Sequence, residues 1–219
     1  MFANVGTGQR LPTYTDLYYK GPTNIGNDQL KTEKSKYAEG GLKFNNDRLA
    51  LNASYFVRRI DNFIDWVKTQ QSDPWQPHNF SQINTKGFTV SADYKLLAAS
   101  ESTLSNVRLG VSYTHLDPGF KKTMSTAVFS RYALESLRNQ LSSTLSADLI
   151  EQLSFTLTTR YCERISYKNY MVMDARLAFK QKKYSIYADG ANLFNIQYIE
   201  AGSVPMPGAW FTLGVKTIF

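Results

Sequence analysis

With 219 residues the chain is long enough for one large β domain or two small ones, and its single cysteine excludes an internal disulfide framework. Two histidines are too few for a His-rich metal site, and the net charge of +7 comes from scattered lysines and arginines, which argues against a nucleic-acid groove. There is no run of 18 apolar residues, so we expect no transmembrane helix. Aromatic residues make up 14% of the chain, which favours strands and membrane–water interfaces.

A period of two residues dominates the chain and predicts β-strands. In residues 48–58, Leu49, Leu51 and Tyr55 share one face, whereas Asn52 and Ser54 share the other. The same alternation recurs at 87–96, 107–115, 141–149, 153–161, 171–180 and 211–219, with weaker candidates at 2–10, 36–44 and 184–193. Each of these roughly ten strands is near the 9–11 residues that a tilted strand needs to cross a bilayer. No segment shows a helical period, so we predict one all-β domain over residues 1–219.

The connections between the expected strands alternate in length. Long connections are expected at 11–35, 67–79, 116–137 and 194–208, tight ones at 45–47, 150–152 and 181–183, and intermediate ones at 98–103 and 165–169. An antiparallel meander places successive connections at opposite ends of its sheet, so the long ones gather at one end. Outer-membrane barrels are built this way, with short periplasmic turns and longer extracellular loops.

Alternation alone does not say which face of the sheet meets water. In a soluble barrel or sandwich the apolar face points inward, whereas in an outer-membrane barrel it points into lipid. Charged side chains stand among the Ser and Thr residues of the polar face, as in a wet lumen, and the chain ends in a strand on the aromatic Phe219. These features favour the membrane interpretation, and a soluble β protein remains the alternative.

Residues 5–35 resemble a segment of the barrels of TonB-dependent outer-membrane receptors. In that family a strand ends in Phe-Arg-x-Pro-Thr, and an Asp/Glu-Leu-Tyr and an Asn-x-x-Leu-x-x-Glu follow. The matching residues are Arg10, Pro12, Thr13, Asp16, Leu17 and Tyr18, then Asn27, Leu30 and Glu33. The segments 52–66, 83–94, 174–179, 191–198 and 214–219 resemble later strands in the right order. Two positions depart from the family pattern: Gln9 replaces a Phe, and Thr217 stands where an aromatic residue is usual.

The resemblance covers essentially the whole chain and is nearest to the vitamin B12 and siderophore receptors. It implies an antiparallel transmembrane β-meander, the C-terminal part of a 22-stranded barrel, with the plug domain absent from residues 1–219. The implied function is part of a receptor that imports a scarce chelate, such as cobalamin or an iron–siderophore, across the outer membrane of a Gram-negative bacterium. We expect this fragment alone not to transport, and we expect no enzymatic activity and no cofactor.

The implied partners are outer-membrane lipid, the barrel-assembly machinery, a small-molecule chelate and a TonB-type energy transducer that acts through a missing N-terminal part. No nucleic-acid partner is expected. The alternative is a self-contained ten-stranded outer-membrane barrel that acts as an enzyme or a small pore. His115 and Asp117 would be its nearest acid–base pair, although two polar residues at a loop boundary are the simpler interpretation.

Two further groups of residues are candidate sites. The resemblance implies that Gly214 and Phe219 belong to a signal read by the barrel-assembly machinery, and the alternative is that Phe219 only faces lipid. The aromatic residues of the long loops are candidates for contact with a bulky ligand or, alternatively, for anchoring at the membrane interface. They are Tyr14, Tyr18, Tyr19, Trp66, Trp75 and Trp210. No catalytic or metal-binding constellation stands out.

Overall fold

The computed structural model describes the chain except residues 98–103, 121–128, 132–136, 166, 201–203 and 218–219. Its elements are β1 (Phe2–Arg10), α1 (Tyr14–Tyr18), β2 (Glu33–Asn45), β3 (Leu49–Lys68), β4 (Gln76–Lys95), β5 (Ser105–Phe120), β6 (Phe129–Ser130), β7 (Leu137–Ile150), β8 (Leu153–Arg164), β9 (Tyr170–Lys180), β10 (Tyr184–Ala191) and β11 (Trp210–Thr217). The strands form one sheet in chain order from β1 to β11, except that the short β6 pairs with β3 off the main path. The expected antiparallel meander of about ten strands is confirmed.

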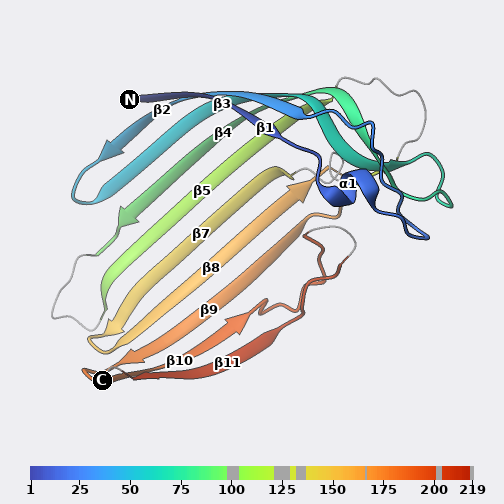
Figure 1. The fold of residues 1–219 in the computed structure, drawn as a ribbon. Coiled ribbons are helices and arrows are strands. Elements are labelled where there is room, and N and C mark those ends of the chain that lie inside the picture. Colours follow the sequence, from blue (N-terminus) through green and yellow to red (C-terminus); the bar gives the residue numbers. More distant parts are fainter. Residues whose placement is uncertain (98–103, 121–128, 132–136, 166, 201–203, 218–219) are drawn as a thin grey trace.

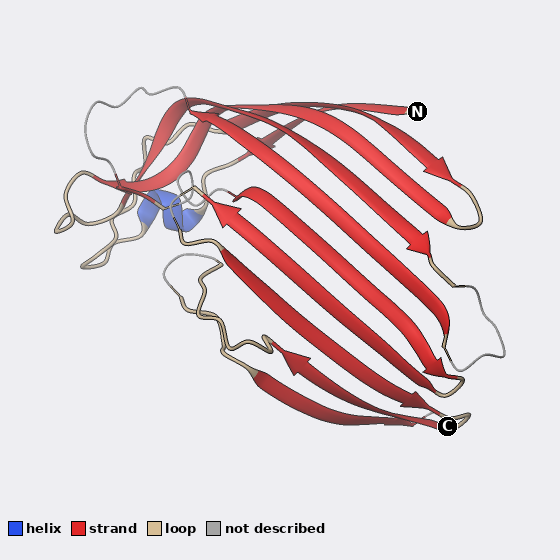
Figure 2. Cartoon of the chain, turned by 180° about the vertical axis from the view of Figure 1, so that it is seen from behind, coloured by secondary structure: helices blue, strands red, loops and turns tan. Residues whose placement is uncertain are grey.

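The sheet is a single, strongly curved layer whose two edges are β1 and β11 (Figure 1). Strand twist and the stagger of the register curl such a sheet toward a barrel wall. Within the described residues, β1 and β11 do not pair with each other, so the sheet stays open. Helix α1 lies at the end of the sheet that carries the longer connections, and the tight turns lie at the opposite end (Figure 2). The predicted alternation of connection lengths holds for the β1–β2, β2–β3, β9–β10 and β10–β11 connections. It fails at the β3–β4 connection, residues 69–75, which is shorter than the β4–β5 connection, residues 96–104, at the opposite end.

The tight turn between β2 and β3 is closed by a side chain that takes the place of a strand partner. In the turn between β2 and β3, the Asn46 side chain accepts hydrogen bonds from the main-chain amides of Arg48 and Leu49, at 2.9 and 2.7 Å. Asn side chains satisfy the backbone in this way two or three residues on, which is why they favour turns.

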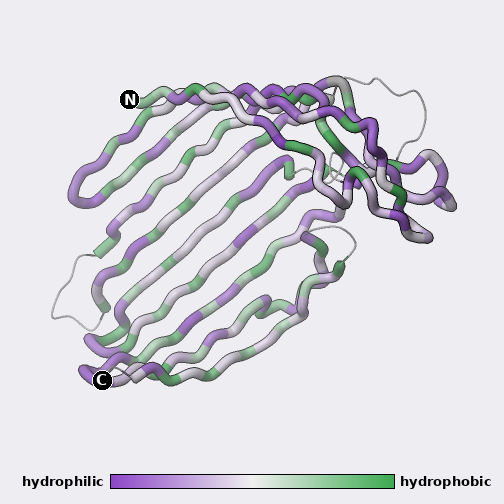
Figure 3. The backbone as a smooth tube through the Cα atoms, in the orientation of Figure 1, coloured by the Kyte–Doolittle hydropathy of each residue, from purple (hydrophilic) through white to green (hydrophobic). Residues whose placement is uncertain are grey.

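The two faces of the sheet differ in polarity, and Figure 3 shows hydrophobic and hydrophilic residues interspersed along the strands. On one face apolar residues oppose each other across the strands, as Tyr55 opposes Phe88 and Ile186 opposes Val215. This face is left open: Leu213 is 77% exposed. An open apolar surface that runs across ten strands exceeds what a water-soluble monomer carries. The register therefore gathers the apolar side chains on the exposed convex face and leaves the Ser, Thr and charged residues to line the concave side.

Strands β3, β4 and β5 are longer than the sequence predicted. β3 and β4 have 20 residues each, so the expected loop 67–79 shrinks to residues 69–75. β5 likewise extends into the expected loop 116–137. Beyond Ile60 the alternation fails because both faces of β3 are covered: Ile64, Trp66 and Val67 are all nearly inaccessible. Where both faces of a strand are buried, the contrast between an apolar and a polar face is lost, so the period of two disappears.

The expectation of a chain without helices is wrong for α1. The helix has five residues, which is too short for a helical period to show. Its signal is local: Thr13 and Asp16 have the spacing of a capping box, in which each residue satisfies a main-chain amide of the other.

Candidate functional site at the loop end of the sheet

Arg10 is the last residue of β1, and its guanidinium joins two carboxylates. Nη1 donates to Glu33 Oε1 at 2.9 Å, and Nη2 donates to Asp16 Oδ2 at 3.2 Å. The Arg10 side chain is 43% exposed, whereas those of Asp16 and Glu33 are 5% and 11% exposed. A buried carboxylate is tolerated when it is paired and hydrogen-bonded, and the Arg fork supplies both. The motif predicted from sequence therefore joins the end of β1, helix α1 and the start of β2.

Asp16 is the centre of this network. Thr13 is the N-cap of α1: its Oγ1 accepts from the Asp16 amide at 3.1 Å, and its own amide donates to Asp16 Oδ2 at 3.0 Å. From β3, Trp66 Nε1 donates to Asp16 Oδ1 at 2.9 Å. Burial raises the pKa of Asp16, but the hydrogen bonds from Thr13 and Trp66, with the charge of Arg10, outweigh it and hold the pKa below its ordinary 3.8. Asp16 is therefore ionised at neutral pH.

The side chain of Glu33 replaces a main-chain hydrogen-bond acceptor at the point where β2 and β3 stop pairing. β2 and β3 pair as far as Lys34 and Asp61, and the next residue, Asn62, has a φ of 58°. Beyond this irregularity the Ile64 amide has no strand partner on that side, and Glu33 Oε1 accepts from it at 2.6 Å. A buried amide without an acceptor costs about 1–3 kcal/mol, so the carboxylate stabilises the extension of β3.

Residues 11–32, named here the docked segment, lie along the extended β3–β4 hairpin. Asn27 donates from its main chain to Asp16 O at 2.8 Å and from its side chain to Pro77 O at 3.1 Å. The side chain of Asn79 accepts from the Lys31 amide at 2.7 Å and donates to Lys31 O at 2.9 Å. The position of Asn27 was expected from the motif, but that of Asn79 was not, because its contact spans 48 residues.

The candidate loop aromatics fall into two groups. Tyr14 and Tyr18 stack on α1 with ring centroids 5.2 Å apart, and both are exposed, as is Tyr19. Trp75 is half-buried, with Lys68 Nζ 5.1 Å and Arg131 Cζ 4.7 Å from its ring centroid. A tryptophan between two cations is held by cation–π attraction on its faces.

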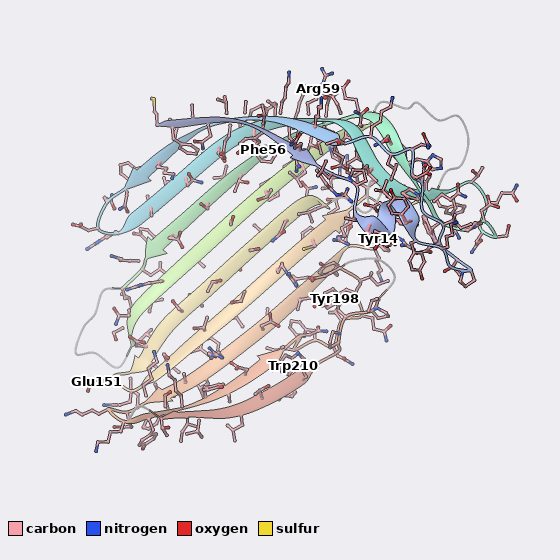
Figure 4. The ribbon with its side chains drawn as sticks, in the orientation of Figure 1. Tyr14, Phe56, Arg59, Glu151, Tyr198 and Trp210 are labelled. Carbon is pink, nitrogen blue, oxygen red and sulfur yellow. The ribbon has the colours of Figure 1, made fainter. Side chains whose placement is uncertain are left out.

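The expectation that Trp66 is a loop aromatic is wrong. Trp66 lies in β3, is 5% exposed and donates to Asp16. Its ring has almost no surface left for a ligand. Trp210 starts β11 and is exposed (Figure 4). Of the motif residues that do not join the network, Pro12 follows the end of β1 and Leu17 is half-buried on α1.

A second hydrogen-bond network, centred on Asn192, organises the connection between β10 and β11. Asn192 is 3% exposed with a φ of 48°, and its side chain donates to Ile196 O at 2.9 Å and to Pro207 O at 3.1 Å while accepting from the Ile196 amide. The turn carries Tyr198 to the polar face, where its ring centroid lies 4.5 Å from that of Tyr170 (Figure 4). This connection therefore folds inward over the concave side.

Beneath this connection lies a small apolar cluster with a charged pair. Cys162, Tyr170 and Val172 are buried together, and Ile196 and Tyr198 pack against them. Cys162 is a buried strand residue with a packing role. Arg160 Nη2 lies 2.6 Å from Glu200 Oε1, so the pair ties the inward-folded connection to β8.

Gly214 has a packing reason to be glycine. A Cβ at this position would overlap the ring of Tyr187, which lies across the neighbouring strand. The Arg176 guanidinium lies 4.9 Å above the same ring and also pairs with Asp189. An aromatic side chain over a strand glycine is a recognised way to pin the register of a sheet. Phe219, the other residue of the expected assembly signal, lies outside the described residues.

The polar face offers charged and aromatic side chains at one end of a curved wall, which suits binding. In the described part of the chain, no three His, Cys, Asp or Glu side chains form a group that could hold a metal ion. In the same residues, no helix is long and apolar enough to cross a bilayer.

Comparisons with known proteins all point to the same family. The family model for the β-barrel of TonB-dependent receptor-like proteins matches residues 1–193. The vitamin B12 transporter BtuB of Vibrio vulnificus is 33% identical over 90 residues, which cover 41% of this chain and 14% of that protein. BtuB of Photobacterium profundum is 33% identical over 95 residues, which cover 42% of this chain and 15% of that protein.

Solved structures agree on the fold. The copper transporter OprC aligns over 97% of this chain with a TM-score of 0.74 and 18% identity, and the siderophore receptor PirA of Acinetobacter baumannii over 99% with a TM-score of 0.70 and 15% identity. The chain spans 36% of the length of OprC and 38% of that of PirA.

Proposed function

The chain belongs to the TonB-dependent receptor β-barrel family, and from this premise we propose that it forms the C-terminal part of a receptor barrel that imports a scarce chelate across the outer membrane of a Gram-negative bacterium. Family members are receptors and transporters, and the chain is not assigned an enzymatic activity. Cobalamin and iron–siderophores are the first ligands to test, because the similar proteins are a vitamin B12 transporter and siderophore receptors.

The observation that carries this proposal is the open sheet with an apolar convex face and a polar concave face. In the described residues β1 and β11 remain unpaired with each other, which favours part of a wider barrel over a closed ten-stranded one. A 22-stranded barrel has room for a plug in its lumen. The ten strands on the main path of this sheet would supply nearly half of such a wall, and the chain spans 36% and 38% of the length of the two solved receptors. The plug, and the segment that contacts the energy transducer, would then be contributed by residues other than 1–219.

The concave loop end would serve as the ligand vestibule of such a receptor, and the arrangement of its side chains supports this role. Helix α1 presents Tyr14 and Tyr18 on one side, and the inward-folded connection presents Tyr198 and the Arg160–Glu200 pair on the other. Flat aromatic surfaces and paired charges suit a bulky, polar chelate that is bound before it is moved. Assembly by the barrel-insertion machinery, with Gly214 and Phe219 in its signal, is part of the same proposal.

An uptake experiment tests the proposal. Cells that lack the complete receptor gene should lose accumulation of one chelate from a panel of labelled cobalamin and ferric siderophores, and the restored gene should recover it. Accumulation should also stop when the membrane is de-energised. Uptake that persists without energy, or a stable pore of one size formed by the 219-residue chain in a planar bilayer, would instead establish the small-barrel alternative.

A further inference from the structure

Three cations lie side by side on the convex face at the loop end of the sheet. They are Lys36 on β2, Arg59 on β3 and Lys86 on β4. Lys36 is directly opposite Arg59 in the register, and Lys86, opposite Val57, is the diagonal neighbour of Arg59. Opposite residues of an antiparallel pair have Cβ atoms about 5 Å apart and diagonal neighbours about 7–8 Å apart, so the three charges can meet one anion. Figure 4 shows Arg59 pointing outward, away from the concave side.

These cations stand at one level, immediately above the apolar band. On each of the three strands the next outward-facing residue toward the tight turns is apolar: Ala38, Val57 and Phe88. A groove of about 310 Å³ runs between them and is lined by Lys36, Ala38, Val57, Arg59, Asn84 and Lys86. A ligand in this groove would touch cations at one end and hydrocarbon-compatible surface at the other. Lipids with an anionic head group have this division.

The local charge balance leaves a deficit of negative charge. Facing the groove on the same side are four cations, namely the three above and Lys34, against two carboxylates, Asp61 and Asp117. Arg59 Nε lies 2.9 Å from Asp61 Oδ1, so one of the two carboxylates is already paired. In the part of the chain that the structure describes, neither Lys36 nor Lys86 has a carboxylate within ion-pair distance. Like charges directly opposite each other destabilise a sheet, so a bound anion would relieve a local repulsion.

We propose that Lys36, Arg59 and Lys86 bind the phosphate of an anionic lipid head group in the outward-facing leaflet, with its acyl chains against the apolar band. Arg59 supplies a fork that matches phosphate oxygens, and the two lysines act as flexible point charges that reach up from their apolar stems. This proposal rests on the outer-membrane placement proposed above.

Titration with lipid tests the site. The complete receptor that contains this chain, purified in neutral-detergent micelles, would be titrated with phosphatidylglycerol and separately with zwitterionic phosphatidylcholine, and bound lipids would be counted by native mass spectrometry. The unmodified receptor should retain phosphatidylglycerol in preference to phosphatidylcholine. Each basic residue near a membrane contributes about a fivefold gain in binding, so K36Q/R59Q/K86Q should lose about a hundredfold.

Matched variants separate the site from general charge. K95Q/K182Q/K183Q removes the same charge at the tight-turn end and should leave the preference unchanged, as should the charge-conserving K36R/K86R. Far-UV circular dichroism and heat-modifiable migration report folding. If the triple variant does not fold, the single K86Q variant, with its fivefold loss, decides the question.

The possible failures are distinct. Equal loss in the tight-turn control, or equal retention of the two lipids by a folded chain, would overturn the lipid site while leaving the proposed function intact. Displacement of bound lipid by equimolar inorganic phosphate would also overturn it, since the site would then recognise free phosphate. A chain that folds without any detergent or lipid would instead contradict the membrane placement itself.

Discussion

Replacing Asp16 by Ala should release the docked segment without unfolding the sheet. The substitution leaves the buried Trp66 Nε1 without an acceptor, which costs about 1–3 kcal/mol, and removes one half of the capping box, worth about 1 kcal/mol. The ion pair with Arg10 adds little, because the guanidinium is 43% exposed and screened by solvent. Together these losses amount to about 3 kcal/mol, which lowers the free energy of local opening of residues 11–32.

Hydrogen–deuterium exchange of the folded chain in micelles measures this opening. A loss of about 3 kcal/mol corresponds to exchange roughly a hundredfold faster for the amides of Leu17 and Asn27, which donate to Thr13 O and Asp16 O. Asp28→Ala is the matched control, since its exposed carboxylate accepts only from the neighbouring Gln29 side chain among the interactions that the structure describes. Strands β8 and β9 should exchange as before. Unchanged exchange of the docked segment in Asp16→Ala would refute the claim that this network holds it.

Three further outcomes follow from the structure. Gly214→Val should displace the Tyr187 ring from β11 and lower the yield of folded barrel in the membrane fraction, whereas Gly6→Val, where a side chain would meet open space, should not; equal yields would contradict the packing role. The folded-state pKa of Asp16 lies below 3.8, so the ionised carboxylate stabilises the docked segment above that pH and ceases to do so in stronger acid. The near-UV circular dichroism of Trp66 should therefore persist down to pH 3.8 and fade only below it. A loss well above pH 3.8 would falsify the role given to ionised Asp16. A membrane-impermeant thiol reagent should label Asn24→Cys in intact cells but not Lys182→Cys, and the opposite pattern would invert the proposed topology.

The sequence predicted the sheet well wherever one face of a strand is apolar and exposed and the other face is polar. The period of two in residues 48–58 and 87–96 survives there because the two environments differ so strongly. The prediction failed from Ile64 to Val67, where the docked segment covers the second face and removes the contrast. Helix α1 was missed because five residues cannot display a helical period, although Thr13 and Asp16 carried its capping signal.

The sequence predicted which residues form the candidate site, but it did not predict the contacts between them. The resemblance singled out Arg10, Thr13, Asp16 and Glu33, and the structure brings all four together. Trp66 is buried against Asp16 only because β3 extends beyond the apolar part of the sheet. That extension in turn depends on the Glu33 carboxylate, which accepts a hydrogen bond from the Ile64 amide. Such mutual dependence is tertiary, so no local pattern reveals it.

The hydrogen-bond networks at the two ends of the sheet follow one physical rule. Where strands stop pairing, their main-chain amides need acceptors, and a buried one left without a partner is costly. Glu33 serves Ile64 at one end of the open sheet, and Asp174 Oδ1 serves the Asn192 amide at 2.7 Å near the other. Each carboxylate thereby holds a connection inward over the concave side. The charged residues at the loop end therefore first hold these connections in place. The side chains that the connections then present are the tyrosines of α1, Tyr198 and the Arg160–Glu200 pair, and the proposed vestibule would offer these to a ligand.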